Sequence, residues 1–158
     1  MSDNQVILTE DGLKEKQSKL EYLKTVRRAE ISEQIKEARA FGDLSENAEY
    51  DEAKNEQARV EAEIAHLEKL LRNAVLIDNS TVDHSTVNIG TYVRIFDEEM
   101  AEEEEYLIVG SVEADADKRR LSNESPVGSA LMGKKVGETA TVDTPTGTIT
   151  LKVLDIHK

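Results

Sequence analysis

Two long stretches of helical periodicity constrain the fold of this chain more than any other feature. The first covers residues 9 to 41 without a proline, and its apolar residues recur at helix-like intervals: Leu13, Leu20, Leu23, Ile31, Ile35 and Ala38. The second is a heptad repeat with one polar member: Ala53, Gln57, Val60, Ile64, Leu67, Leu71 and Ala74. Such patterns predict two amphipathic helices with a coiled-coil seam, the first of them capped by Thr9.

A few residues, at 42 to 47, join the two patterns, so the helices must run antiparallel and bury their seams against each other. At 1.5 Å per residue, about 33 residues of helix make a rod of roughly 50 Å. Apolar stripes of this kind usually form a core and nothing more. Here they also place the connecting segment "GDLSENAEY" at the far end of a solvated rod.

The sequence beyond Ile77 predicts strands. A polar linker is followed by strand candidates at 92–96, 106–109, 139–142 and 148–156. Residues 145–147, "PTG", are typical of a hairpin turn between the last two strands. Ser125 and Pro126 are typical of the cap and first position of a short helix. These features predict a small antiparallel sheet with one helix.

Composition agrees with two separate parts. Charged residues make up 34% of the 158 residues and aromatic residues only 4%, which is lean for one compact core. We therefore expect an α+β protein, with a helical hairpin at 1–78 and a sheet domain at 79–158.

The formal charge of −13 excludes strong binding to free nucleic acid, because such binding depends on neutralising phosphates. A partner must therefore present any nucleic acid. The acidic run at 97–105 is most simply a solvated hairpin extension. The chain has no cysteine, and we see no secretion signal and no membrane span. We expect a soluble, cytoplasmic monomer.

The acidic tip has two interpretations. In the first, Gly42 ends the first helix, Asp43 or Ser45 caps the second, and Glu46 lies in its first turn. In the second, Asp43 and Glu46 bind magnesium, a hard cation that takes one or two carboxylates together with waters and phosphates. Spacing alone favours the turn, because two carboxylates make a poor metal site unless another protein supplies further ligands.

Arg28, Lys36 and Arg39 form a loose stripe toward the tip. Local ion pairs are one explanation, and contact with RNA phosphates is the other. No hydrolytic motif appears, since the three histidines lie far apart in sequence and Ser129 lacks a nucleophile elbow. The chain is therefore poorly equipped to be an enzyme alone.

At "GDLSENAEY" the chain resembles the bacterial Gre transcript cleavage factors. The resemblance continues through "IGTYVRI", "YLIVGS", "EAD" and "SPVGSALMGKKVGE", and it spans nearly all of the sequence. It implies an N-terminal antiparallel coiled coil and a C-terminal domain of the FKBP-like fold. It also implies docking on RNA polymerase at its secondary channel, with no stably bound cofactor in the free protein.

The resemblance implies that Asp43 and Glu46 help hold a second magnesium ion in the polymerase active centre. They thereby stimulate the polymerase to cleave the RNA 3′ segment in backtracked complexes. The protein is expected to meet the RNA 3′ end and the template DNA only within such a complex. Asn47, Glu49 and Tyr50 then match flanking tip positions, along with Gly42 and Ser45. In the second domain, polymerase contact is expected at Glu124, Ser125 and Pro126.

Three alternatives stay open. A Gre-like protein can occupy the channel and inhibit transcription without cleavage, although such proteins tend to have altered tips. A prolyl isomerase is suggested only by the FKBP-like fold, and Tyr92, Phe96 and Tyr106 are few aromatics for its pocket. A coiled-coil adaptor would bind polymerase without using the tip acids.

Overall fold

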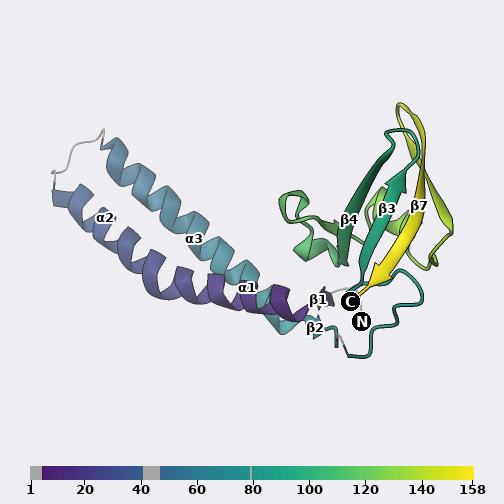
Figure 1. Cartoon of the computed structure of the whole chain (residues 1–158). Coiled ribbons are helices and arrows are strands. Elements are labelled where there is room, and N and C mark those ends of the chain that lie inside the picture. The colour runs from purple at the N-terminus through teal and green to yellow at the C-terminus, as the bar shows by residue number, and fades with distance from the viewer. Residues whose placement is uncertain (1–4, 41–46, 79) are drawn as a thin grey trace. The chain divides into compact units, whose positions relative to one another are not determined.

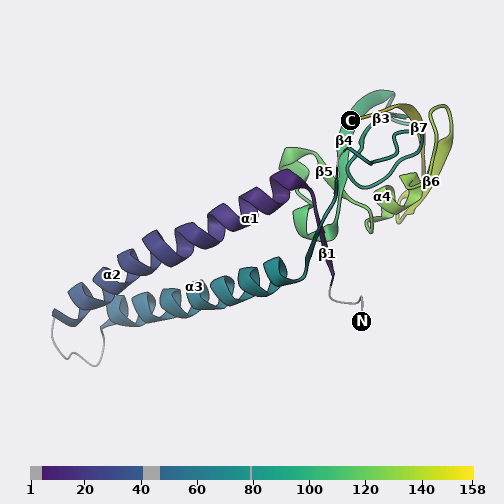
Figure 2. The ribbon, with the colours of Figure 1, turned by 90° about the horizontal axis from the view of Figure 1, so that it is seen from below.

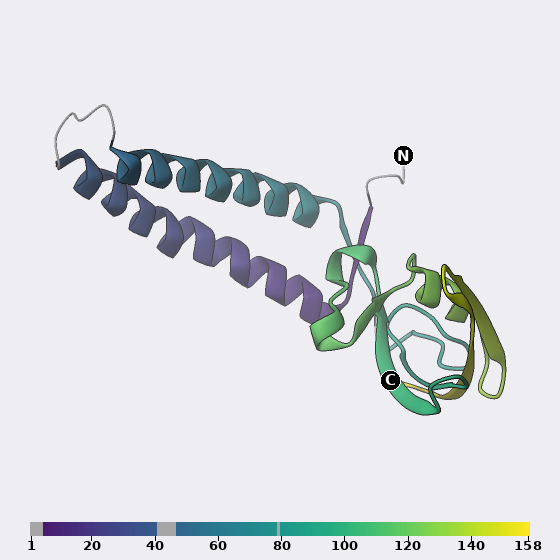
Figure 3. The same cartoon turned by 90° about the horizontal axis from the view of Figure 1, so that it is seen from above.

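The helical hairpin forms as the heptads predict. The structure, a computed structural model, describes residues 5–40, 47–78 and 80–158. The first helix is α1 (Glu10–Tyr22), a π-helical turn η2 (Leu23–Arg27) and α2 (Arg28–Ala40), and the second is α3 (Ala48–Arg72). The two helices lie side by side (Figures 1 and 3). Their shared core confirms both predicted seams: Leu23, Ile31, Ile35, Ala53, Val60, Ile64 and Leu67.

The π-helical turn accommodates an irregular spacing of apolar residues in the first seam. Leu23 and Ile31 are eight residues apart, whereas a heptad allows seven. The Arg28 N–H bonds to the Leu23 carbonyl, five residues back, so the turn absorbs one extra residue. The Thr25 hydroxyl donates to the Glu21 carbonyl at 2.7 Å and occupies an acceptor at this irregular turn. The seam therefore returns to the interface beyond the turn.

Two seam residues of the second pattern differ from the prediction. Ala74 lies in a short strand, β2 (Ala74–Leu76), beyond the end of α3 at Arg72. Leu70 is buried, while Leu71 is only half-buried, because Leu71 lines an open groove with Leu20 and Thr25. Along the flanks, ion pairs connect the two helices: Lys19 with Glu63 at 2.6 Å, Lys24 with Glu68 at 3.6 Å and Arg28 with Glu61 at 2.7 Å. These pairs are exposed, so each adds little stability.

The second part is a five-stranded sheet in the order β5-β4-β3-β7-β6 (Figure 2). Its elements are β3 (Tyr92–Asp97), β4 (Glu102–Val109), β5 (Arg120–Ser122), α4 (Pro126–Leu131), β6 (Thr139–Thr144) and β7 (Gly147–His157). The four predicted strands and the short helix are confirmed. The pairs are antiparallel except that β5 lies parallel to β4, so the sheet is mixed. The α+β fold class holds.

The acidic run extends the β3–β4 hairpin, as predicted. Half of it is strand, because β4 begins at Glu102 and pairs with β3 through Asp97. The core of this part is aliphatic and includes Leu131 from α4. Among the described residues, no helix has the length and apolar character needed to cross a membrane.

The two short segments that flank the hairpin helices in sequence belong to the same compact unit as the sheet. Two short strands, β1 (Val6–Leu8) and β2 (Ala74–Leu76), pair in parallel, and the Ile77 N–H donates to the Leu8 carbonyl at 2.9 Å. Contacts accordingly group the chain into two compact units, Leu13–Asn73 and Met1–Gly12 with Ala74–Lys158. The predicted domain boundary between residues 78 and 79 stays a prediction.

Candidate functional site

Asn47 joins the two helices immediately beneath the tip. Its Oδ1 accepts a hydrogen bond from the Tyr50 N–H at 3.1 Å, which makes Asn47 the N-cap of α3. Its Nδ2 donates to the Ala38 carbonyl of α2 at 2.7 Å. The prediction of Asp43 or Ser45 as the cap is therefore wrong, and Glu46 precedes the helix. The amide of Asn47 supplies both the acceptor and the donor that this position uses.

Glu49 and Tyr50, predicted to support the tip, lie in the first turn of α3. A carboxylate there interacts favourably with the positive end of the helix dipole. The Tyr50 ring packs against the hairpin core, and the Arg39 guanidinium lies 6.0 Å from its centroid. The two helix ends that flank the tip are thus tied together by an amide and an aromatic ring.

The residues expected to perform the chemistry, Asp43 and Glu46, lie outside the described residues, as do Gly42 and Ser45. Within 5–40, 47–78 and 80–158, no group of three or more His, Asp or Glu side chains is arranged to hold a metal ion. The predicted magnesium site therefore stays a prediction, and it would have to combine tip carboxylates with ligands from a partner.

A groove of about 490 Å³ opens between α2 and α3 on the tip side of the hairpin. Four glutamates and two arginines line it, with three further residues: Glu37, Glu49, Glu52, Glu56, Arg27, Arg59, Gln34, Ala38 and Ala53. Its charge is therefore acidic overall. An acidic groove repels phosphate, so RNA is not expected to bind here.

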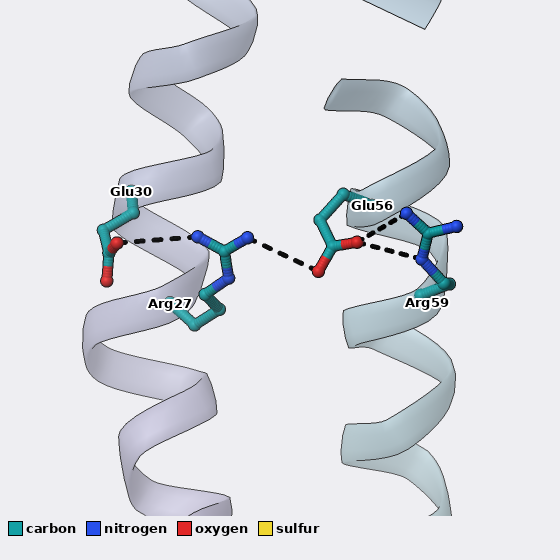
Figure 4. A network of polar contacts seen from close by, with 4 residues as sticks. All are labelled: Arg27, Glu30, Glu56 and Arg59. Atoms are coloured by element: carbon teal, nitrogen blue, oxygen red, sulfur yellow. Dashed lines mark hydrogen bonds and ion pairs between the residues drawn. The ribbon is translucent and has the colours of Figure 1, made fainter. Parts of the chain in front are cut away.

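The two arginines of the groove are held by carboxylates (Figure 4). Arg59 donates to Glu56 at 2.6 and 2.9 Å, and Arg27 contacts Glu56 at 3.4 Å and Glu30 at 3.5 Å. The hydrogen bond from Arg59, followed by that from Arg27, holds the pKa of Glu56 below its ordinary value. Glu56 is therefore ionised at neutral pH and bridges the two helices.

The predicted basic stripe is not uniform. Arg28 donates to both carboxylate oxygens of Glu61, at 2.8 and 2.7 Å, and this bond raises the pKa of Arg28. Its contacts match the ion-pair interpretation. Lys36 is exposed, and Arg39 lies against Tyr50 nearer the tip.

Hydrogen bonds within the chain hold the backbone of the expected docking loop. The Ser125 hydroxyl accepts from the Gly128 N–H at 3.1 Å and donates to the Ser122 carbonyl at 2.7 Å, so the predicted cap of α4 is confirmed. A Cβ at Gly128 would lie 1.8 Å from the Ser122 carbonyl oxygen, which only glycine permits. Glu124 and Pro126 remain exposed on this loop.

Sequence reasoning missed the residues that support the loop. The Ser111 hydroxyl donates to the Glu124 carboxylate at 2.7 Å and lies 3.0 Å from the Ser122 hydroxyl. Glycine within a predicted helix was an available signal for Gly128. Nothing in the pattern around Ser111 or Ser122 distinguishes them from ordinary turn serines.

Two of the three aromatic residues considered for an isomerase pocket, Tyr92 and Tyr106, lie on opposite faces of the sheet. Tyr106 is paired with Val93 across the β3–β4 ladder, so it shares the inner face of the sheet with that buried residue. Tyr92 neighbours Val93 in the strand and therefore points to the other face, where it stacks on His157 at 5.2 Å. These two side chains therefore do not line a common pocket.

Both the helical part and the sheet part are similar to known proteins. Residues 6–76 match the family described as transcription elongation factor, N-terminal, and residues 82–158 match transcription elongation factor, GreA/GreB, C-terminal. The transcription elongation factor GreA of Caldanaerobacter subterraneus subsp. tengcongensis is 59% identical over 97% of this chain and 98% of its own. That of Clostridium perfringens is 51% identical over all of both chains. The crystal structure of GreA factor homolog 1 (Gfh1) of Thermus thermophilus is 29% identical, with coverage of 98% and 99% and a TM-score of 0.44.

Proposed function

The chain belongs to the GreA/GreB family of transcription elongation factors, and we propose that it reactivates backtracked RNA polymerase by stimulating cleavage of the RNA 3′ segment. The observation that carries the proposal is the hairpin. Helix α3 alone has 25 residues, or roughly 37 Å, and its N-terminus, capped by Asn47, directly follows the acidic segment in the sequence. Such a rod is narrow enough to enter a channel and carries its acidic segment at the end.

The tip supplies oxygen ligands. We propose that Asp43 and Glu46 complete the coordination of a magnesium ion whose other ligands belong to the polymerase and the RNA. When bound, magnesium lowers the pKa of a water molecule and stabilises charge on the phosphate. The chain's own contribution is to place two carboxylates at the reacting phosphate and to orient the attacking water. It then acts on the polymerase's reaction and performs none alone.

Charge makes the action depend on the partner. A net charge of −13 and an acidic groove beneath the tip repel free RNA. The polymerase must therefore bind both the RNA and this factor. We retain Lys36 and Arg39 as the candidates for RNA contact, because Arg28 would first have to break its bidentate pair with Glu61.

Docking is assigned to the loop at Glu124, Ser125 and Pro126. Its backbone is fixed by hydrogen bonds before any partner binds, which lowers the entropic cost of binding. The exposed Glu124 carboxylate is suited to a basic site on the polymerase.

The family relationship supports elongation activity over the inhibitor alternative. The isomerase is disfavoured by the separated aromatic side chains. An experiment separates our proposal from the adaptor hypothesis. If the protein were only an adaptor, removing the tip carboxylates would change no reaction.

The test measures RNA cleavage in backtracked polymerase complexes with magnesium. We expect the wild-type protein to accelerate cleavage, and the Asp43→Asn, Glu46→Gln double variant to lose about 10²-fold or more of that acceleration while still binding polymerase. The matched control is Glu98→Gln, Glu99→Gln, which removes two exposed charges from the β3–β4 turn and is expected to act like wild type. Equal cleavage by the wild-type and tip variants would exclude the catalytic assignment.

A further inference from the structure

Glu113 is the one acidic side chain among the described residues that is buried, with 5% of its surface exposed. It lies in a 3₁₀ turn, η3 (Ser111–Glu113). Both of its carboxylate oxygens accept hydrogen bonds from Thr9: Oε2 from the backbone N–H at 2.8 Å and Oε1 from the hydroxyl at 2.6 Å. A carboxylate is costly to bury, so its retention here calls for a reason.

The partner of Glu113 is the start of the hairpin. Thr9 precedes α1, and its hydroxyl oxygen accepts from the Gly12 N–H at 3.1 Å. The Glu113 charge thus lies at the helix N-terminus, where backbone N–H groups favour an anion. A Cβ at Gly12 would lie 2.1 Å from the Glu113 carboxyl carbon, so the close approach requires glycine.

The same turn also supports the docking loop. Two residues before Glu113, the Ser111 hydroxyl donates to Glu124 at 2.7 Å and contacts Ser122 at 3.0 Å. Next to it, a Cβ at Gly110 would lie 2.7 Å from the Ile7 carbonyl oxygen, so β1 packs closely on this turn as well. The turn η3 therefore contacts the docking loop on one side and the segment leading into α1 on the other, all within one compact unit.

We propose that Glu113 is a positioning residue for transcript cleavage, which fixes the first turn of α1 on the turn that supports the docking loop. The inference rests on the proposed function. An apolar side chain could fill the same space but would not fix the orientation of Thr9. The two hydrogen bonds that Thr9 donates to one carboxylate fix both its distance from Glu113 and its orientation. The first turn of α1 is thereby fixed within the compact unit that carries the docking loop.

The test separates maximal cleavage rate from docking. Cleavage in backtracked complexes is measured over a range of factor concentrations. For Glu113→Ala, we expect the rate at saturation to fall about tenfold, because misplacement remote from the chemistry is costly. The concentration that gives half the maximal rate is expected to change less than about twofold, since the docking loop itself is unaltered.

Rescue distinguishes positioning from general support. Glu113→Gln retains an acceptor for the Thr9 N–H and a donor for its hydroxyl oxygen, so its rate at saturation should stay within about twofold of wild type. Val112→Ala, an exposed position in the same turn, is the matched control and should behave as wild type. Folding is checked by circular dichroism at the assay temperature. If Glu113→Ala is unfolded there, Thr9→Val, which removes only the hydroxyl, is scored in its place.

Three results would overturn the proposal. The first is a variant, Glu113→Ala or its substitute Thr9→Val, that cleaves at the wild-type rate when the factor is saturating. The second is a variant whose lower cleavage rate is explained wholly by a higher half-saturating concentration. The third is failure of Glu113→Gln to restore the rate. If the wild-type protein itself does not stimulate cleavage, the proposed function fails too, so the two failures are distinguishable.

Discussion

Asn47 binds both helices through a single side chain. Its carbonyl oxygen caps α3, and its amino group donates to the last turn of α2. A side chain that is only an acceptor could make the first of these bonds but not the second. One amide therefore connects the end of α2 with the start of α3, the two helix ends between which Asp43 and Glu46 lie in the sequence.

We expect Asn47→Ala to lower the free energy of unfolding by about 2 kcal/mol, since both a cap and a cross-helix hydrogen bond are lost. Asn47→Asp keeps the cap and loses only the bond to Ala38, so about 1 kcal/mol is expected. Urea unfolding followed by circular dichroism measures both. Asn55→Ala, an exposed change on the same helix, is the control and should not destabilise. Equal losses for Asn47→Ala and Asn47→Asp would contradict the second hydrogen bond.

Single residues also mark the limit of prediction from sequence. The caps at Thr9 and Ser125 were predictable, because each depends on a few adjacent residues. The Asn47 cap was missed because three candidate caps lie within five residues, and only the position of Ala38 decides among them. Glu113 and Thr9 are 104 residues apart, so no local sequence pattern predicts their contact.

At the scale of elements, the periodicity of apolar residues decided which helices and strands could be predicted. The seams of α2 and α3 were predictable because helical burial repeats every three to four residues. The three-residue strands β1, β2 and β5 were missed, since alternation cannot be recognised over so short a span. All three pair in parallel, β1 with β2 and β5 with β4, so no hairpin turn marks them in the sequence.

The π-helical turn yields an element-scale prediction. Deleting Thr25 restores a seven-residue interval between Leu23 and Ile31, so the free energy of unfolding should stay within about 1 kcal/mol of wild type. Deleting Glu33 instead rotates Ile35 and Ala38 out of the core, which should cost about 2 to 5 kcal/mol. Urea unfolding of the two deletion variants gives the comparison. Similar losses would mean that the turn does not absorb an extra residue.

The hairpin should also lose stability in acid. Hydrogen bonds from arginines hold the pKa values of Glu56 and Glu61 below the ordinary 4.5. A carboxyl with a lowered folded-state pKa stabilises the fold above its unfolded pKa, and the effect is lost as pH falls through the folded value. Unfolding measured between pH 7 and 3 should therefore show a weaker decline in a Glu56→Gln, Glu61→Gln variant. Added salt should reduce the difference, because these pairs are exposed.

At the scale of the whole molecule, the residues that we propose for docking and those that we propose for chemistry lie in different parts of the chain. The loop at Glu124 belongs to the compact unit with the sheet, and the hairpin helices form the other. Changing the tip therefore leaves the docking loop intact. A factor without tip carboxylates should still occupy the polymerase.

We therefore expect the Asp43→Asn, Glu46→Gln variant to inhibit cleavage stimulated by the wild-type protein. At equal affinities, an equimolar mixture should show about half the wild-type rate when polymerase is saturated, because each complex holds one factor. Adding Glu124→Lys to the tip variant should remove this competition, since the reversed charge weakens docking. A folded tip variant that leaves the wild-type rate unchanged at tenfold excess would place the docking contact on the tip itself and contradict the assignment to the loop.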